Sequence, residues 1–270
     1  MEETRKRLVV VADDFGRSLG VNRAIAAAHA GGIVTSASLM AGGVAFDDAV
    51  EVARHHPRLA VGLHATFCDG RAVLPRSLVP DLVDATGRLE TDPARAGIRY
   101  WRRRKAMLPQ LEAEAEAQFD RLDGVGIAPT HVDGHHHLHI HPVLFRIVCR
   151  AAARRGVRWV RVPEGELASG RVVEWATFGL LAIGNRRVAA RHGMMAPRRV
   201  AGLARTGRLD ERYLLGKIKR IGTGWNEIFA HPDLDTEAGR RELDALTSPR
   251  VRACLEGSGI TLSSYGEDRK

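Results

Sequence analysis

The sequence has few cysteines, and their arrangement excludes two kinds of scaffold. Cys68, Cys149 and Cys254 are widely separated and show neither a CxxC nor a CxH spacing. A scattered set of three cysteines argues against a disulfide framework and against a zinc site built from thiolates. It indicates a reducing compartment.

Long hydrophobic runs are also missing. The stretch from Arg7 to Asp14, RLVVVADD, has a short apolar run before two aspartates, too short for the core of a signal peptide. No stretch approaches the roughly 18 to 20 apolar residues that a membrane-spanning helix needs. The sequence therefore predicts a cytoplasmic protein.

Basic residues outnumber acidic ones and are concentrated in two segments. The 41 Lys and Arg against 32 Asp and Glu give a formal net charge of +9. The segments are RYWRRRK, from Arg99 to Lys105, and the stretch from Arg186 to Arg208. No zinc finger, helix-turn-helix, P-loop or aromatic-interleaved RNA motif accompanies them, so we do not expect a nucleic-acid partner. A solvated basic face is the simplest interpretation, ahead of either binding role.

The composition is typical of a folded globular chain. Hydrophobic residues make up 44% and charged residues 27% of the 270 residues, which argues against disorder or a fibrous repeat. A (β/α) barrel of about 250 residues is a common single unit. Because no repeat, low-complexity tract or boundary divides the sequence, we expect one domain over residues 1–270.

Short β-branched runs alternate with amphipathic segments in the first part of the chain. RLVVVADD predicts a buried parallel strand, and SLGVNRAIAAAHAGG predicts a helix that Ser18 caps and the two glycines end. VTSASLMAGG and LAVGLHAT repeat the strand pattern on either side of a helix at AFDDAVEVARHHP. Strands that alternate with helices in this way predict an α/β fold with a parallel sheet.

The remainder of the chain is less regular. The proline-containing region at about 68–108 predicts a long loop excursion over one end of the sheet, of the type that covers a binding cleft. LPQLEAEAEAQFDRL predicts a helix, residues 165–222 have weak helical signals, and further strands are expected at VRWVRVPEG, WNEIFAHP and GITLSSY. About seven strands fit either a barrel or an open doubly wound sheet, and in both the active site lies at the C-terminal ends of the strands.

Three predicted strands end in residues that bind metals. They are Asp13 and Asp14 in ADDFG, His64 in GLHAT, and the histidines of THVDGHHHLHIHP from Thr130 to Pro142. One carboxylate and two imidazoles from separate strands would leave open positions for water and substrate, as a catalytic divalent site requires. The alternatives are a helix cap or turn for the aspartates and a hydrogen-bonded core position for His64.

The histidine segment is the strongest of these signals. We predict that it continues as an extended strand, so that alternate side chains share one face: His131, Asp133, His135, His137 and His139. These groups cannot all bind one ion. One or two would ligate while the others orient them or contact substrate, and a wet surface strand is the alternative.

Hydrolysis also needs a base and an acid. Adjacent carboxylates at a strand end point in different directions, so one can bind the metal while the other acts as base. FAHPD places His231 at the end of a late strand, where an acid would fit, although a turn residue before Pro232 is an equal alternative.

Motifs in chain order show a family resemblance. VADDFGRSLGVNRAIAAAHAGGIVTSASLMAGG, VGLHATF, PTHVDGHHHLHIHP and FAHPD resemble the YdjC-like carbohydrate deacetylases, a group that includes chitooligosaccharide deacetylase. The resemblance implies a distorted (β/α) barrel related to polysaccharide deacetylases, one divalent metal ion, and removal of acetyl from an N-acetylated sugar. Carried over by motif, Asp14, His64 and His135 would bind the metal, Asp13 would be the base, and His231 the acid or oxyanion stabiliser.

A narrower resemblance concerns the substrate. DGRAVLPRSLVPDLVDATGRL, AGIRYWRRRKAMLPQLEAEAEAQF and VRVPEG are similar to the hopanoid-biosynthesis-associated branch of the family. This implies an N-acetylglucosaminyl hopanoid as substrate, with soluble chitooligosaccharides as the alternative. A lipid-linked substrate would let Tyr100, Trp101 and the basic residues 102–105 make a peripheral contact with an anionic inner-membrane surface.

Several assignments stay open at this level. Zinc and magnesium are the favoured ions, and cobalt or manganese would suit the same Asp-His-His set. Arg161, His137 and Asp133 are candidates for contacts with the sugar, and a homodimer is left open. A metal-dependent phosphoesterase is disfavoured because no second carboxylate-histidine cluster is evident, and a non-catalytic sugar- or lipid-binding barrel would not need the base and acid.

Overall fold

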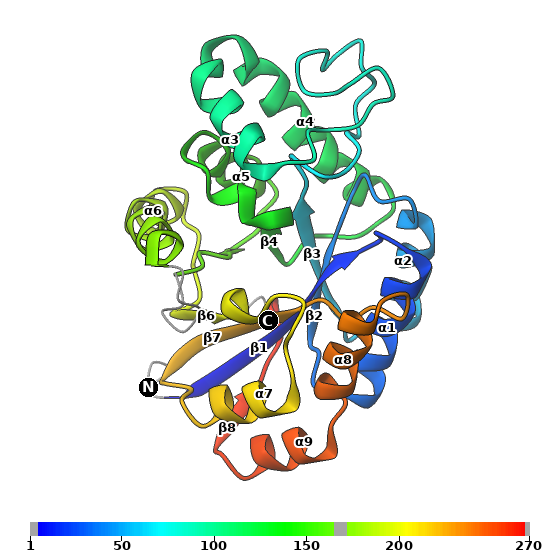
Figure 1. The fold of residues 1–270 in the computed structure, drawn as a ribbon, viewed down its shortest axis with the longest axis vertical. Coiled ribbons are helices and arrows are strands. Elements are labelled where there is room, and N and C mark those ends of the chain that lie inside the picture. Colours follow the sequence, from blue (N-terminus) through cyan, green and yellow to red (C-terminus); the bar gives the residue numbers. More distant parts are fainter. Residues whose placement is uncertain (1–4, 165–171, 268–270) are drawn as a thin grey trace.

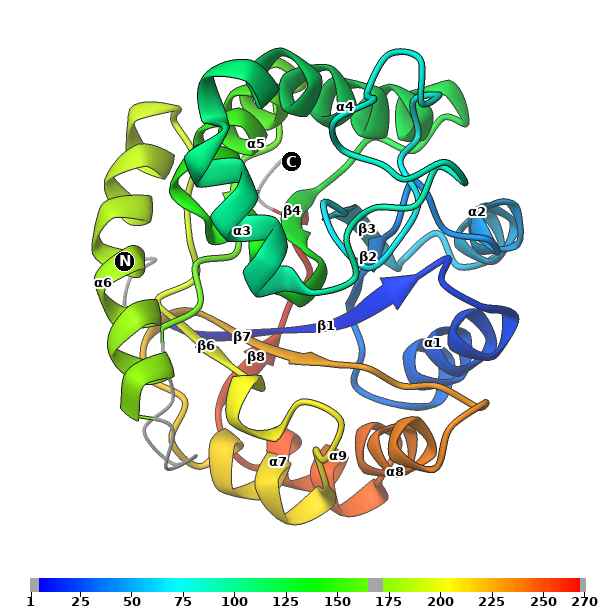
Figure 2. The ribbon, with the colours of Figure 1, turned by 45° about the horizontal axis from the view of Figure 1, so that its top comes forward.

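Parallel strands form the centre of the protein, and helices wrap around them (Figures 1 and 2). The computed structural model describes residues 5–164 and 172–267. Seven strands follow the order β5-β4-β3-β2-β1-β7-β6, and β8 pairs with the N-terminal part of β1. The bounds are β1 Lys6–Phe15, β2 Ser36–Leu39, β3 Ala60–Ala65, β4 His131–Gly134, β5 Trp159–Val160, β6 Arg199–Ala201, β7 Gly224–Ala230 and β8 Ile260–Leu262. Every pairing between these strands is parallel.

Helices surround the curled sheet, and α3 lies in front of it in this view (Figure 2). Their bounds are α1 Leu19–Gly31, α2 Phe46–His55, α3 Pro93–Arg102, α4 Arg104–Gly124, α5 Pro142–Arg154, α6 Val172–Arg191, α7 Glu211–Ile218, α8 Glu237–Leu246 and α9 Pro249–Glu256. The two ends of the sheet approach each other, because Trp159 in β5 forms a bridge with Met195 shortly before β6. The predicted α/β class is confirmed, and the sheet curls into a partial barrel instead of staying open. None of the helices in the described part of the chain is long and apolar enough to cross a bilayer.

The alternation of side chains along each strand separates two environments. In β1, Leu8 and Val10 pack with the helices, while Val9 and Val11 join an interior cluster that includes Trp159, Phe229 and Tyr265. Because successive side chains on a strand point to opposite faces, every second residue up to the end of the strand points into the interior, as Val9 and Val11 do. This alternation places polar side chains inside the barrel, above the aromatic cluster. All of them are buried: Asp13, Ser38, His64, His131, Asp133, Arg161 and Glu227.

The excursion between β3 and α4 contains more regular structure than its sequence suggests. Residues 68–92 form loops, but α3 follows at Pro93–Arg102 because Asp92 caps it through the amides of Ala94 and Arg95. The side chains of α4 fasten these loops to the barrel: Gln118 bonds both backbone groups of Thr66, and Glu114 accepts from the amides of Val73 and Leu74. The loop that follows β3 is therefore held in one position.

Two predicted strands are corrected by the structure. The histidine strand ends at Gly134 and passes into a short 3₁₀ segment, His135–Ile140, in which His136 and His137 have left-handed φ values of 51° and 54°. The strand expected at VRWVRVPEG is only Trp159–Val160, and β6 has no counterpart among the predicted strands. The weakly patterned region 165–222 contains α6, β6 and α7, and its residues 165–171 lie outside the described part.

Candidate active site

The two adjacent aspartates at the end of β1 are directed by backbone conformation. Asp13 lies on the same face of β1 as Val9 and Val11, so it points into the barrel, where it is fully buried. Asp14 would point to the helical layer in a regular strand, but its φ of +64° rotates it out of the alternation. Both carboxylates therefore reach the same end of the barrel.

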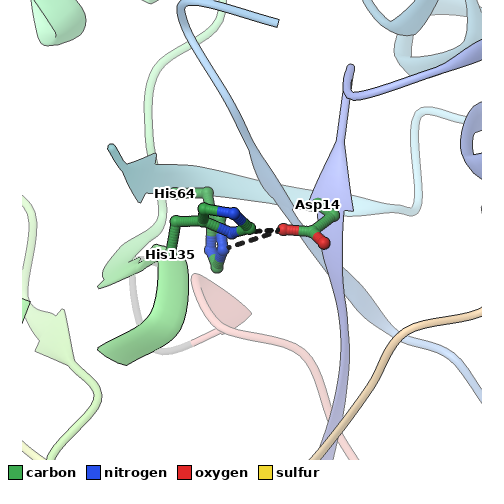
Figure 3. A group of neighbouring side chains, drawn as sticks. All are labelled: Asp14, His64 and His135. Atoms are coloured by element: carbon green, nitrogen blue, oxygen red, sulfur yellow. Dashed lines mark ion pairs between the residues drawn. The ribbon is translucent and has the colours of Figure 1, made fainter. Parts of the chain in front are cut away.

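Asp14, His64 and His135 converge from three separate segments (Figure 3). Asp14 Oδ1 lies 2.8 Å from His135 Nδ1 and 3.3 Å from His64 Nε2. Ligands of a tetrahedral zinc ion, each about 2.0 to 2.1 Å from the metal, are themselves about 3.3 Å apart. The two distances from Asp14 are close to this spacing, and all three ligand atoms lie within 4.8 Å of one another, so a small divalent cation could be held between them.

The hydrogen bonds around this trio leave ligand lone pairs unused. His64 Nδ1 lies 2.7 Å from Asp133 Oδ1, and since the carboxylate can only accept, Nδ1 carries a proton. Nε2, which faces Asp14, is therefore the nitrogen of His64 that would bind a metal. Asp14 Oδ1 is buried and makes no hydrogen bond within the described structure. A buried oxygen facing two nitrogens without a hydrogen bond fits a site for a cation. The residues present therefore suit the divalent ion that the motifs imply.

The electrostatics of the trio also favour positive charge. Burial alone would lower the pKa of His64, but Asp133 and Asp14 outweigh it and raise that pKa to about 10. Burial opposes ionisation of Asp14, yet His135 and His64 hold its pKa well below the usual range. A divalent cation between these groups would take the place of the extra proton.

A buried arginine lies beneath the trio and joins three carboxylates. Arg161 bonds both oxygens of Asp13, at 2.6 and 2.8 Å, lies 2.7 Å from Asp133 Oδ2, and donates through Nε to Glu227. Tyr265 donates its hydroxyl to the other oxygen of Glu227. Arg161 is only 2% exposed, so this network fixes the orientation of Asp13 and Asp133 from below.

His231 follows β7 and lies beside Asp13. Its Nε2 is 3.8 Å from Asp13 Oδ2, and its ring is 26% exposed. The backbone amide of His231 donates to the buried Glu242 at 2.6 Å, which holds the turn after β7 against α8. An imidazole and a carboxylate thus stand next to each other at the edge of the trio.

A pocket of about 770 Å³ opens over these groups. Its lining includes both aspartates, the other two members of the trio, and two predicted residues, His137 and His231. Arg161 and Asp133 do not line it, because both are buried beneath it. The contact with the sugar that we suggested for Arg161 and Asp133 is therefore not available in this geometry. The pocket volume falls in the range of small-molecule sites.

Comparisons with known proteins identify the family of the chain. The profile of the family described as "YdjC-like protein" matches residues 7–257. The chain belongs to this family. A carbohydrate deacetylase of Geobacillus stearothermophilus is 32% identical over 96% of both chains. A chitooligosaccharide deacetylase of Yersinia pestis is 36% identical over 96% of this chain and 98% of its own. The crystal structure of a candidate cellobiose-phosphate cleavage protein from Enterococcus faecalis superposes with a TM-score of 0.73, at 25% identity and covering 97% of this chain and 98% of its own.

Sequence reasoning missed one acidic residue of this YdjC-like site. Asp69, in the loop after β3, has its Oδ2 3.5 Å from His135 Nε2 and 3.2 Å from His136 Nε2. A second carboxylate-histidine cluster is therefore present, contrary to what we inferred from the sequence. The signal was weak, because TFCDG is typical only of a turn. The position of Asp69 is evident only in the structure, where hydrogen bonds with Glu114 and Gln118 of α4 hold the loop beside the trio.

The buried His139 should make the YdjC-like barrel less stable in acid. Burial lowers the pKa of His139 from its ordinary 6.5 to about 4, and its Nε2 donates to the carbonyl of Arg161. Above pH 6.5 the ring is neutral in both states, whereas between pH 6.5 and 4 only the unfolded chain takes up the proton. The free energy of unfolding should fall across this window, by at most about 3 kcal/mol from this group.

The substitution His139→Gln tests this expectation, because glutamine keeps a donor and does not titrate. We expect the variant to be less stable than the wild type at pH 8 but to lose less of its stability between pH 7 and 4.5. Urea unfolding of both proteins in the presence of a chelator measures the difference. Parallel losses in the two proteins would contradict the assignment.

Proposed function

We propose that this YdjC-like protein is a divalent-metal-dependent N-deacetylase that hydrolyses the acetamide of N-acetylglucosaminyl groups. The observation that carries the proposal is the convergence of Asp14, His64 and His135 at the floor of a pocket beside Asp13 and His231. The relatives named as carbohydrate deacetylase and chitooligosaccharide deacetylase, aligned over nearly their whole length, support it.

The positions of the side chains support the roles that we propose for them. Bound by Asp14, His64 and His135, the ion would polarise a water molecule and the acetyl carbonyl. Asp13 accepts a proton from that water molecule while the oxygen of the water attacks the carbonyl carbon. His231 then donates a proton to the nitrogen as the carbon–nitrogen bond breaks, which releases acetate and the amine of the sugar.

Arg161 and Asp133 act in this proposal as positioning residues. Arg161 holds both oxygens of Asp13, which keeps the carboxylate at a fixed angle toward the pocket. Burial opposes ionisation of Asp133, but Arg161 and His64 outweigh it and lower the pKa of this carboxyl. Asp133 therefore stays charged and keeps the proton of His64 on Nδ1, away from the metal.

The finer substrate proposal is a sugar carried by a hopanoid lipid, with soluble chitooligosaccharides as the equally supported alternative. The pocket is large enough for a sugar unit and is open to solvent on one side. Incubation of the metal-loaded protein with an N-acetylglucosaminyl lipid and, separately, with chitobiose decides between them. Mass spectrometry should show the loss of one acetyl unit, and no loss from either would reject the deacetylase proposal.

A metal-dependent phosphoesterase is the second candidate. The observation in its favour is the cluster of Asp69, His135 and His136, which shares His135 with the trio, because many phosphoesterases use two neighbouring metals. Release of inorganic phosphate from simple phosphomonoesters, with no acetate from N-acetylated sugars, would favour this candidate over the deacetylase.

Replacement of Asp69 by Asn should weaken metal binding without abolishing it. Asp69 Oδ2 lies 3.5 Å from the nitrogen of His135 that points away from Asp14. This contact is longer than the 2.7 Å hydrogen bond between Asp133 and His64, but carboxylates on this side of a ligating imidazole orient it. Loss of such a partner costs about 10- to 100-fold in affinity. Competition with a chromophoric chelator measures the zinc affinity directly. Exposed Asp84→Asn, in the same excursion, is the matched control, and equal affinities in the two variants would remove this role.

A further inference from the structure

A second groove lies outside the active site and is lined mainly by residues of α3, α4, α5 and α6. Its volume is about 800 Å³. Part of the lining is apolar: Ile147 is buried, Val143 and Val188 are half-buried, and Trp101 and Leu108 are 51% and 39% exposed. Apolar side chains open to water in one groove indicate a binding surface.

The rest of the lining is strongly basic. Arg104, Lys105, Arg146 and Arg191 are exposed, and within the described residues none of them forms an ion pair with a carboxylate. Glu112, the single acidic residue of the lining in the described part of the chain, is paired with Arg150, so it does not neutralise these four. The groove therefore combines an apolar surface with an excess of uncompensated positive charge.

We propose that this groove docks the protein on anionic phospholipids at a bilayer surface. Basic side chains within reach of an anionic membrane each contribute about 1 kcal/mol, and tryptophan favours the headgroup region. Arg104 also lies over the Trp101 ring, 5.1 Å from its centroid, so that cation and aromatic face the same surface. Nucleic acid fits less well, because Trp101 is the one Phe, Tyr or Trp among the described lining residues and offers no row of stacking platforms.

The groove lies close to the mouth of the active site. Helix α3 begins at Pro93, which lines the active-site pocket, and reaches Trp101, which lines the groove. At a rise of about 1.5 Å per residue, these two positions are about 12 Å apart. A membrane surface in contact with the groove would therefore lie near the active-site pocket. The proposal does not depend on the proposed function, since docking requires no turnover.

Flotation of the full-length, metal-loaded protein with vesicles tests the docking. One set of vesicles is pure phosphatidylcholine and the other contains phosphatidylglycerol, each at low and high salt. We expect binding to the anionic vesicles at low salt, and a partition coefficient lower by at least roughly 30-fold for the double variant Arg146→Glu and Arg191→Glu, because loss of the two basic contributions alone accounts for that factor. Trp101→Ala should weaken binding at both salt concentrations, because its contribution is not screened.

The matched control is Arg23→Glu with Arg240→Glu, which makes the same change of net charge on exposed positions of α1 and α8. An equal loss of binding in the control would show attraction by net charge alone and overturn the assignment to the groove. Absence of binding to any vesicle, or binding to a single-stranded oligonucleotide in preference to vesicles, would also overturn it. Deacetylation of chitobiose should stay unchanged in the groove variants, which separates this test from that of the proposed function.

Discussion

The substitution Asp13→Asn is expected to lower kcat by roughly 10²- to 10⁴-fold, the range associated with the loss of a general base. Asparagine has the same size but cannot accept the proton of the attacking water. The proposed metal ligands are other residues, so zinc affinity should remain close to that of the wild type. Acetate release under saturating substrate gives kcat, and calorimetric titration with zinc gives the affinity of the same preparation.

Two comparisons make the Asp13→Asn result specific. Asp235→Asn is the matched control, because Asp235 lines the same pocket but bonds to Ser18 and not to the network around Arg161. It should change kcat by less than about tenfold. Wild-type turnover in Asp13→Asn would exclude the role as base. A large fall in thermal stability would instead assign the effect to the ion pair of Asp13 with Arg161.

Local patterns predict the part of this site that lies on regular strands. The β-branched run before Asp13 and Asp14 predicts a buried strand. The alternation of side chains along it is enough to predict that Asp13 points inward with Val9 and Val11. The same reasoning holds for His64 and Asp133, which adjoin each other on neighbouring strands because β3 and β4 pair in register. Parallel strands bring their C-terminal ends to one rim, so residues far apart in the chain meet there.

The positions that sequence could not predict depend on tertiary contacts. The strand pattern of the histidine segment stops at Gly134, where the β-carbon of any other residue would lie only 2.9 Å from the carbonyl oxygen of Ala65. His136 and His137 then adopt left-handed conformations that no periodicity indicates. Arg161 is a surface residue by composition alone, and only the three carboxylates around it account for its burial.

Loss of one metal ligand should have an effect as large as loss of the base. The substitution His135→Ala removes one of the two imidazoles that face Asp14, which leaves the buried carboxylate with a weaker partner set. Because a bound cation stabilises the transition state by several kcal/mol, kcat/KM should fall by roughly 10³-fold or more. Zinc affinity, measured by chelator competition, should fall in the same variant.

The neighbouring His136→Ala is the matched control, since it removes an imidazole from the same segment that faces Asp69 and not Asp14. It should retain zinc in the main site and lose at most about tenfold in activity, the lower end of what an orienting partner contributes. If His135→Ala bound zinc like the wild type, His135 would not be a ligand. If it lost zinc but kept its turnover, the hydrolysis would proceed without the metal, and Asp13 and His231 would have to account for the whole reaction.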